Sequence, residues 1–232
     1  MLFYANPILI AAAVLPAIFL LVQIYRADKL DRESGWLIAS LVFQGIVSTA
    51  LAVWTERLGS VVLGWLLPEN SVVYRAILYF VVVACSEEGF KYLLLKRRTW
   101  NSPEFNCQFD AVVYAVAVSL GFALWENIDY VIMYGLGTAM LRAVTAVPGH
   151  ACFGVFMGAF YGMAKRCHNY GRPGQARTFR RLAVLMPVLL HGAYDFIASG
   201  TGSSWVFVVF VAVMFLAANR MVRSLSRNDR YI

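Results

Sequence analysis

Acidic, basic and imidazole side chains interrupt several long apolar stretches of this sequence at helical spacing. Glu87 and Lys91 are four residues apart, and Glu88 and Lys91 are three apart. Both glutamates can therefore meet the lysine on one face of a helix. A neutralising ion pair explains one glutamate and the lysine, but it leaves the second glutamate without a cation. An extra carboxylate in such a place is the kind of group that general acid–base chemistry uses.

A histidine and an aspartate with the same spacing occur further along the chain. His191 and Asp195 are four residues apart, so the aspartate can fix the tautomer that the imidazole presents. A buried hydrogen bond that holds helices together explains this pair equally well. His150 lies in another apolar segment and shifts the interpretation towards catalysis. It follows Pro148, and a proline permits a helix to kink where it lines a cavity.

Glu126 and Asn127 form a third polar group. At 1.5 Å per residue, the two histidines come out near the middle of a bilayer. The Glu87–Glu88 pair falls nearer one face and Glu126 nearer the other, although a bend at Gly121 would reduce the gap. The sequence leaves open whether Glu126 meets the pair.

Helices in a membrane must position these groups. The chain has 232 residues, of which 60% are hydrophobic and 14% charged, and its mean hydropathy is +0.65. Apolar runs of about 18 residues or more are typical of bilayer-spanning helices. The apolar segments cover residues 3–25, 35–54, 72–95, 108–133, 140–164, 181–199 and 203–222. We therefore predict an all-α, polytopic transmembrane bundle of about seven spans, with residues 1–232 as a single membrane domain.

The distribution of basic residues predicts the orientation. Lysine and arginine gather in every second loop, after the first, third and fifth segments, and in the C-terminal tail. By the positive-inside rule, the N-terminus lies outside and the C-terminus in the cytoplasm. This pattern accounts for the net charge of +7 without nucleic acid as a partner. Anionic lipid headgroups are the expected partners of the basic loops.

Charged groups near the bilayer centre cost about 2.5–3.5 kcal/mol each, so several of them together predict a functional site around a water-filled cavity. Glu88 or Glu87 could activate a water molecule as general base, with Lys91 holding the other glutamate. His150 and His191 could stabilise an oxyanion or protonate the leaving amine. No serine is paired with a histidine here, and Cys152 lies on a different helix face from His150.

Three alternatives remain open from the residues alone. Two histidines and a glutamate also suit a zinc ion with an open position for water. A proton-coupled transporter uses similar intramembrane groups, although no repeated half is visible in this sequence. A non-catalytic membrane scaffold could keep polar residues for assembly.

Four motifs in order carry a resemblance to a known family. Glu87–Lys91 fits EExxK, and Phe122–Asn127 fits FxxxEN. His150–Gly154 fits HxxxG, and His191–Asp195 fits HxxxD. Each motif alone is weak, but the ordered set, in about residues 70–200, resembles the PrsW family of intramembrane proteases. That family is distantly similar to the type II CAAX prenyl endopeptidases.

The resemblance implies a multi-pass protease of the bacterial inner (plasma) membrane. Such proteases cut a single-pass membrane protein, an anti-sigma factor, on its extracytoplasmic side and thereby start a stress-response cascade. The resemblance also implies that the glutamates and histidines of the motifs are essential. The expected catalytic residues, which would also supply the ligands of any metal, are Glu87, Glu88, Glu126, His150 and His191. The expected supporting residues are Lys91, Asn127 and Asp195.

Overall fold

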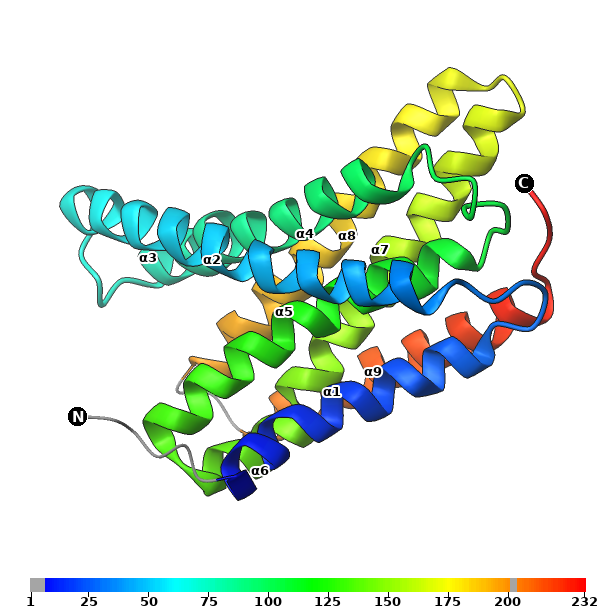
Figure 1. Ribbon diagram of the computed structural model, residues 1–232. Coiled ribbons are helices and arrows are strands. Elements are labelled where there is room, and N and C mark those ends of the chain that lie inside the picture. Colours follow the sequence, from blue (N-terminus) through cyan, green and yellow to red (C-terminus); the bar gives the residue numbers. More distant parts are fainter. Residues whose placement is uncertain (1–6, 201–203) are drawn as a thin grey trace.

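The structure is a computed structural model that describes residues 7–200 and 204–232 (Figure 1). These residues form helices and no strand, with one isolated antiparallel bridge between Cys107 and Tyr231. The prediction of an all-α bundle is confirmed. The helices are α1 (Pro7–Ala27), α2 (Gly35–Leu66), α3 (Val72–Ile77), the π-helix η1 (Leu78–Val83), α4 (Ala84–Thr99), α5 (Asp110–Tyr134), α6 (Leu136–Val144), α7 (Ala146–Asn169), α8 (Pro173–Ala198) and α9 (Ser204–Arg227).

Six helical stretches of the described chain are long and apolar enough to cross a membrane. The expected segment 72–95 is the exception, because α3, η1 and α4 divide it and α4 carries charged residues. The expected segment 35–54 is too short, since α2 continues to Leu66. The segment expected at 140–164 is divided at Thr145 between α6 and α7. The expected starts at residues 3 and 203 lie outside the described residues.

Helix α5 is the centre of the bundle. Every residue from Asp110 to Ala123 is buried, and α5 packs against α1, α2 and α7. Gly154, Gly158 and Gly162 form a ridge along α7 that faces α5. A Cβ on any of them would come within 3.0 Å of α5 or of the residue Gln108 just before it. Small residues at this spacing let two backbones approach closely, so α5 and α7 form one tightly packed unit.

The outer surfaces of the bundle are apolar. Trp36 and Trp65 of α2 and Trp205 of α9 are among its exposed large side chains. An apolar exterior around a polar interior is the arrangement that a lipid environment requires. The protein is therefore a multi-pass membrane protein.

Candidate active site

The first polar group lies on α4. The Lys91 ammonium is 2.7 Å from Glu88 Oε1 and 3.2 Å from Glu87 Oε2. Lys91 and Glu88 are fully buried, and the Lys91 Nζ atom lies 3.8 Å from the centre of the Phe122 ring. The pairing expected from the three- and four-residue spacing is therefore present. One buried cation holds two carboxylates in a fixed arrangement, which removes much of the cost of burying them.

The π-helix η1 leads directly into α4 and helps to orient it. The segment ends in three consecutive valines, Val81–Val83, and β-branched residues are poor α-helix formers. Such widened turns frequently occur at functional sites. Phe80 of η1 packs against Gly192 of α8, where a Cβ would collide with the Phe80 ring. This close contact brings α8, and with it His191, against α4.

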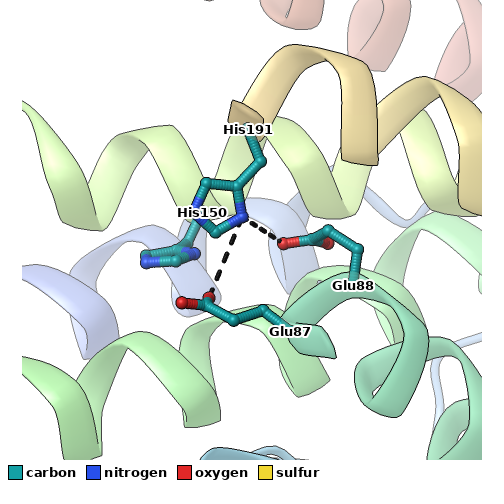
Figure 2. A group of neighbouring side chains, drawn as sticks. All are labelled: Glu87, Glu88, His150 and His191. Atoms are coloured by element: carbon teal, nitrogen blue, oxygen red, sulfur yellow. Dashed lines mark hydrogen bonds and ion pairs between the residues drawn. The ribbon is translucent and has the colours of Figure 1, made fainter. Parts of the chain in front are cut away.

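His191 bonds to the glutamate pair across the helix interface, as Figure 2 shows. Its Nδ1 atom is 2.9 Å from Glu88 Oε1 and 3.8 Å from Glu87 Oε2. Its Nε2 atom lies 3.4 Å from Asp195 Oδ2, so carboxylates flank both ring nitrogens. The ring also stacks on Phe153, with the ring centres 4.7 Å apart. The imidazole of His191 is thus held in position on three sides.

His150 joins the cluster from the start of α7. The helical conformation is interrupted at Thr145, and α7 begins at Ala146. Pro148 therefore lies in the first turn of α7, where a proline costs no helical hydrogen bond. His150 Nδ1 lies 3.2 Å from Lys91 Nζ, and His150 Nε2 lies 2.9 Å from Glu126 Oε2. Glu126 therefore reaches the α4 group through His150, which answers the question of depth that the sequence left open.

Arg142 and Asn127 hold the outer side of the network. Arg142 of α6 donates to Glu126 Oε2 at 2.8 Å and to Asn127 Oδ1 at 2.9 Å. The Asn127 amide donates to the Ala13 carbonyl of α1 at 2.8 Å. All eight residues singled out from the sequence thus belong to one connected network. Asn127 lies at its edge and ties α1 and α6 to α5.

A cavity of about 240 Å³ opens onto this network. Its wall includes Glu87, Glu126, His150, His191 and Asp195. The carboxylate of Glu88 and the ammonium of Lys91 are fully buried behind that wall. A cavity of this size has room for several water molecules, and Glu87 is the member of the glutamate pair that faces it.

Several residues of the cavity wall were not predicted from the sequence. Glu56 was overlooked because the second span was expected to end at residue 54, whereas α2 continues through an apolar run after Arg57. Arg142 was not among the residues predicted for the site. The other missed polar residues are Tyr79, Tyr130 and Tyr194. Tyrosines are common in apolar helices, so no signal in the sequence separates these three from packing residues.

The donor atoms in this cluster fit a metal ion. One ligand atom each from Glu87, Glu88, His150 and His191 lies within 4.8 Å of the others, and all four side chains are buried. Imidazole nitrogens with carboxylate oxygens are ligands that zinc accepts. Lys91 already contacts Glu88 Oε1 and His150 Nδ1, but Glu88 Oε2 is buried without a partner. That orphaned oxygen is the atom that a metal ion would satisfy.

Comparisons with known proteins identify a family for this chain. The PrsW family, described as intramembrane metalloproteases, matches residues 33–218. Protease PrsW of Oceanobacillus iheyensis is 33% identical, over 95% of this chain and 97% of that protein. Protease PrsW of Bacillus subtilis is 31% identical, over 90% of each chain. No solved structure matches the chain.

These relatives are proteases, which favours a hydrolase over the transporter and scaffold alternatives. Both the family match and the relatives extend well beyond the four motifs, so the likeness covers nearly the whole membrane domain. The chain belongs to the PrsW family of intramembrane proteases.

Proposed function

We propose that the protein hydrolyses a peptide bond of a single-pass membrane protein, such as an anti-sigma factor, in the bacterial plasma membrane. The supporting observation is one group of ligand atoms drawn from three helices. Glu87, His150 and His191 lie in the wall of one cavity, and Glu88 is buried behind that wall. The family membership supports proteolysis, and the bacterial relatives support the location. The class of substrate rests on the family resemblance.

Glu87 is the general base in this proposal. Its carboxylate lies in the cavity wall, whereas Glu88 is enclosed by Lys91 and His191. Glu87 would take a proton from a water molecule as that water attacks the scissile carbonyl carbon. The C–N bond then breaks as the leaving amine receives a proton. Glu88 acts as a positioning residue, because it fixes both the lysine and the histidine.

The two histidines stabilise the charge that develops in the transition state. His150 and His191 both line the cavity, and their ring centres are 5.3 Å apart. Either ring could donate to the oxyanion or to the leaving nitrogen. Glu126 holds His150 by its Nε2 atom, and Asp195 lies beside Nε2 of His191. These carboxylates set the orientation of the imidazoles and favour their protonated forms during the reaction.

A zinc ion fits the same proposal. His150, His191 and one glutamate of the pair would hold it, and the other glutamate would remain available as the base. A zinc ion at this place would polarise the scissile carbonyl and activate the attacking water.

The test is cleavage in reconstituted vesicles. The purified protein and a candidate single-pass substrate are combined in liposomes, with and without a chelator. Wild type is compared with Glu87→Gln, Glu88→Gln, His150→Ala and His191→Ala, and with Glu69→Gln as an exposed control. We expect cleavage by wild type and by the control only. Folded cavity variants that still cut at the wild-type rate would rule the proposal out. Zinc that co-purifies with the active protein would assign the metal-dependent form.

A further inference from the structure

A second cluster of buried carboxylates lies at the end of the bundle that holds the C-terminus (Figure 1). Asp28 and Glu33 belong to the connection between α1 and α2, and Asp110 begins α5. One carboxylate oxygen of each lies within 4.8 Å of the others. Asp229, in the tail after α9, groups in the same way with Asp110 and Cys107. Three distant parts of the chain thus converge on one acidic centre.

Several polar atoms in this cluster are buried and have no partner. Oδ1 of Asp110 and Oδ2 of Asp229 are in this state, and the Asp28 carboxylate has no side-chain partner, with the backbone N–H groups of Leu30 and Asp31 nearby. The Tyr114 hydroxyl is also buried and lies close to the Glu33 carboxyl. Asp28, Asp110 and Tyr114 are 0% exposed. Burying a carboxylate without a partner is energetically unfavourable. A bound ligand would supply the missing partner.

The protein itself does not neutralise the cluster. Across residues 7–200 and 204–232, none of the four carboxylates forms an ion pair with a lysine or arginine. Arg32 donates to the backbone carbonyl of Asp28 and not to its side chain. Asp28 is fully buried and Glu33 is 4% exposed. The anionic forms therefore lack the solvation that they have in water.

Backbone N–H groups fix the orientation of the Asp110 and Asp229 carboxylates. The backbone N–H groups of Asn106 and Cys107 donate to Asp110 Oδ2, and that of Phe109 donates to Asp229 Oδ1. In Asp110 and Asp229 one oxygen is held by the backbone and the other has no partner. Such a preorganised set of free oxygens is what a bound cation requires.

We infer that Asp28, Glu33 and Asp110 bind a hard divalent cation of the Mg²⁺ type, with Asp229 beside the site. Such ions prefer carboxylate oxygens at about 2.0–2.6 Å, and oxygens on opposite sides of the ion are then up to about 5 Å apart. The separations of at most 4.8 Å between the ligand atoms fit this arrangement. An all-carboxylate set with no histidine favours magnesium, manganese or calcium over zinc.

The cation stabilises the packing of the tail, the residues after α9, against the bundle. Ser226 already donates to the Ala27 carbonyl, and Gln108 N–H donates to the Arg230 carbonyl. These hydrogen bonds join the segments that carry the carboxylates. A cation at their centre offsets the repulsion between the carboxylates, so its removal would loosen the α1–α2 connection and the tail together.

The test is the thermal unfolding of the full-length protein in detergent after chelator treatment and dialysis. We expect the melting midpoint of wild type to rise saturably with added Mg²⁺. Asp28→Asn and Glu33→Gln should lose this rise. Asp31→Asn, an exposed position in the same connection, should keep it. The series is repeated in a His191→Ala background, which removes one of the four possible intramembrane ligands, and the rise should persist there.

Direct binding covers the case in which a variant folds poorly. Bound Mn²⁺ is measured by electron paramagnetic resonance on wild type and Glu33→Gln, and one site per chain should be lost in the variant. An absent response in wild type would overturn the inference. So would a response that survives in both Asp28→Asn and Glu33→Gln but disappears with His191→Ala, because the ion would then bind in the intramembrane cluster.

Discussion

The two buried polar clusters of this protein balance their charges in opposite ways. The intramembrane cluster brings its own cations, since Lys91 contacts Glu87 and Glu88, and Arg142 contacts Glu126. The cluster at the end of the bundle has carboxylates, backbone donors and a tyrosine, and no lysine or arginine pairs with it in the part of the chain that the structure describes.

Their surroundings explain this difference. A carboxylate deep in a bilayer is costly unless a cation lies beside it, and here Lys91 and Arg142 of the chain itself supply that charge. The second cluster lies at the ends of the helices and can recruit an ion from solution. The comparison teaches that lysine and arginine side chains of the protein pair with the intramembrane carboxylates, whereas the terminal carboxylates depend, in our inference, on an ion from solution.

The largest effect is expected from Glu87→Gln, which removes the carboxylate that faces the cavity. We expect cleavage in vesicles to fall by about 10²–10⁴-fold, the usual contribution of general acid–base catalysis. Folding should be retained, because Lys91 keeps Glu88 as its closer partner. Melting curves of the variant check the folding. A Glu87→Gln protein that cleaves at the wild-type rate would show that Glu87 is not the general base.

Substitution of Lys91 tests whether its ammonium group neutralises the intramembrane glutamates. Lys91→Met leaves two buried carboxylates without their ammonium, and breaking such a pair costs about 3–5 kcal/mol. We expect a large drop in the denaturation midpoint and in yield. The control is Arg97→Met at an exposed position of the same helix, which should change stability little. Equal effects of the two substitutions would mean that Lys91 does not balance the cluster.

A smaller effect is expected from Asp195→Asn. This change weakens the orientation of His191 without removing the imidazole, and outer partners of this kind are worth about 10–100-fold. The rate of cleavage should fall by that amount at saturating substrate. Asp129→Asn, an exposed position on α5, serves as the matched control. Loss as complete as in Glu87→Gln would place Asp195 among the reacting groups.

The smallest expected effect is on the melting midpoint. It distinguishes the two clusters by the metal ion that each binds. After chelation we expect Zn²⁺ to restore cleavage, because histidine nitrogens favour it. Mg²⁺ should restore the few degrees lost from the melting midpoint through binding to the native state, without restoring cleavage. If one ion restored both properties, the two clusters would not be separate sites.

Local spacing was sufficient to predict part of the site. Glu87, Glu88 and Lys91 meet because residues three and four apart share a helix face. The prediction of a membrane bundle rested on the long apolar runs, and six helical stretches of the described chain are long and apolar enough to cross a membrane. Both features depend on residues close together in the sequence.

Contacts between helices could not be predicted in this way. Glu126 reaches the cluster through His150, and this contact depends on the break at Thr145. Glu56 lies in the cavity wall because α2 extends beyond residue 54, the end expected from the sequence. The terminal cluster joins Asp28 to Asp110 and Asp229, and no local pattern connects residues so far apart.

The glycine ridge of α7 has a consequence for how this protein can change over evolutionary time. Gly154, Gly158 and Gly162 lie against α5 so closely that even one methyl group would push the two helices apart. His150 stands one turn before Gly154 on the same helix, so such a shift would misalign the imidazole with its partners. We expect natural and laboratory variants to accumulate on the lipid-facing sides of α1, α2 and α9, and to be rejected along this seam.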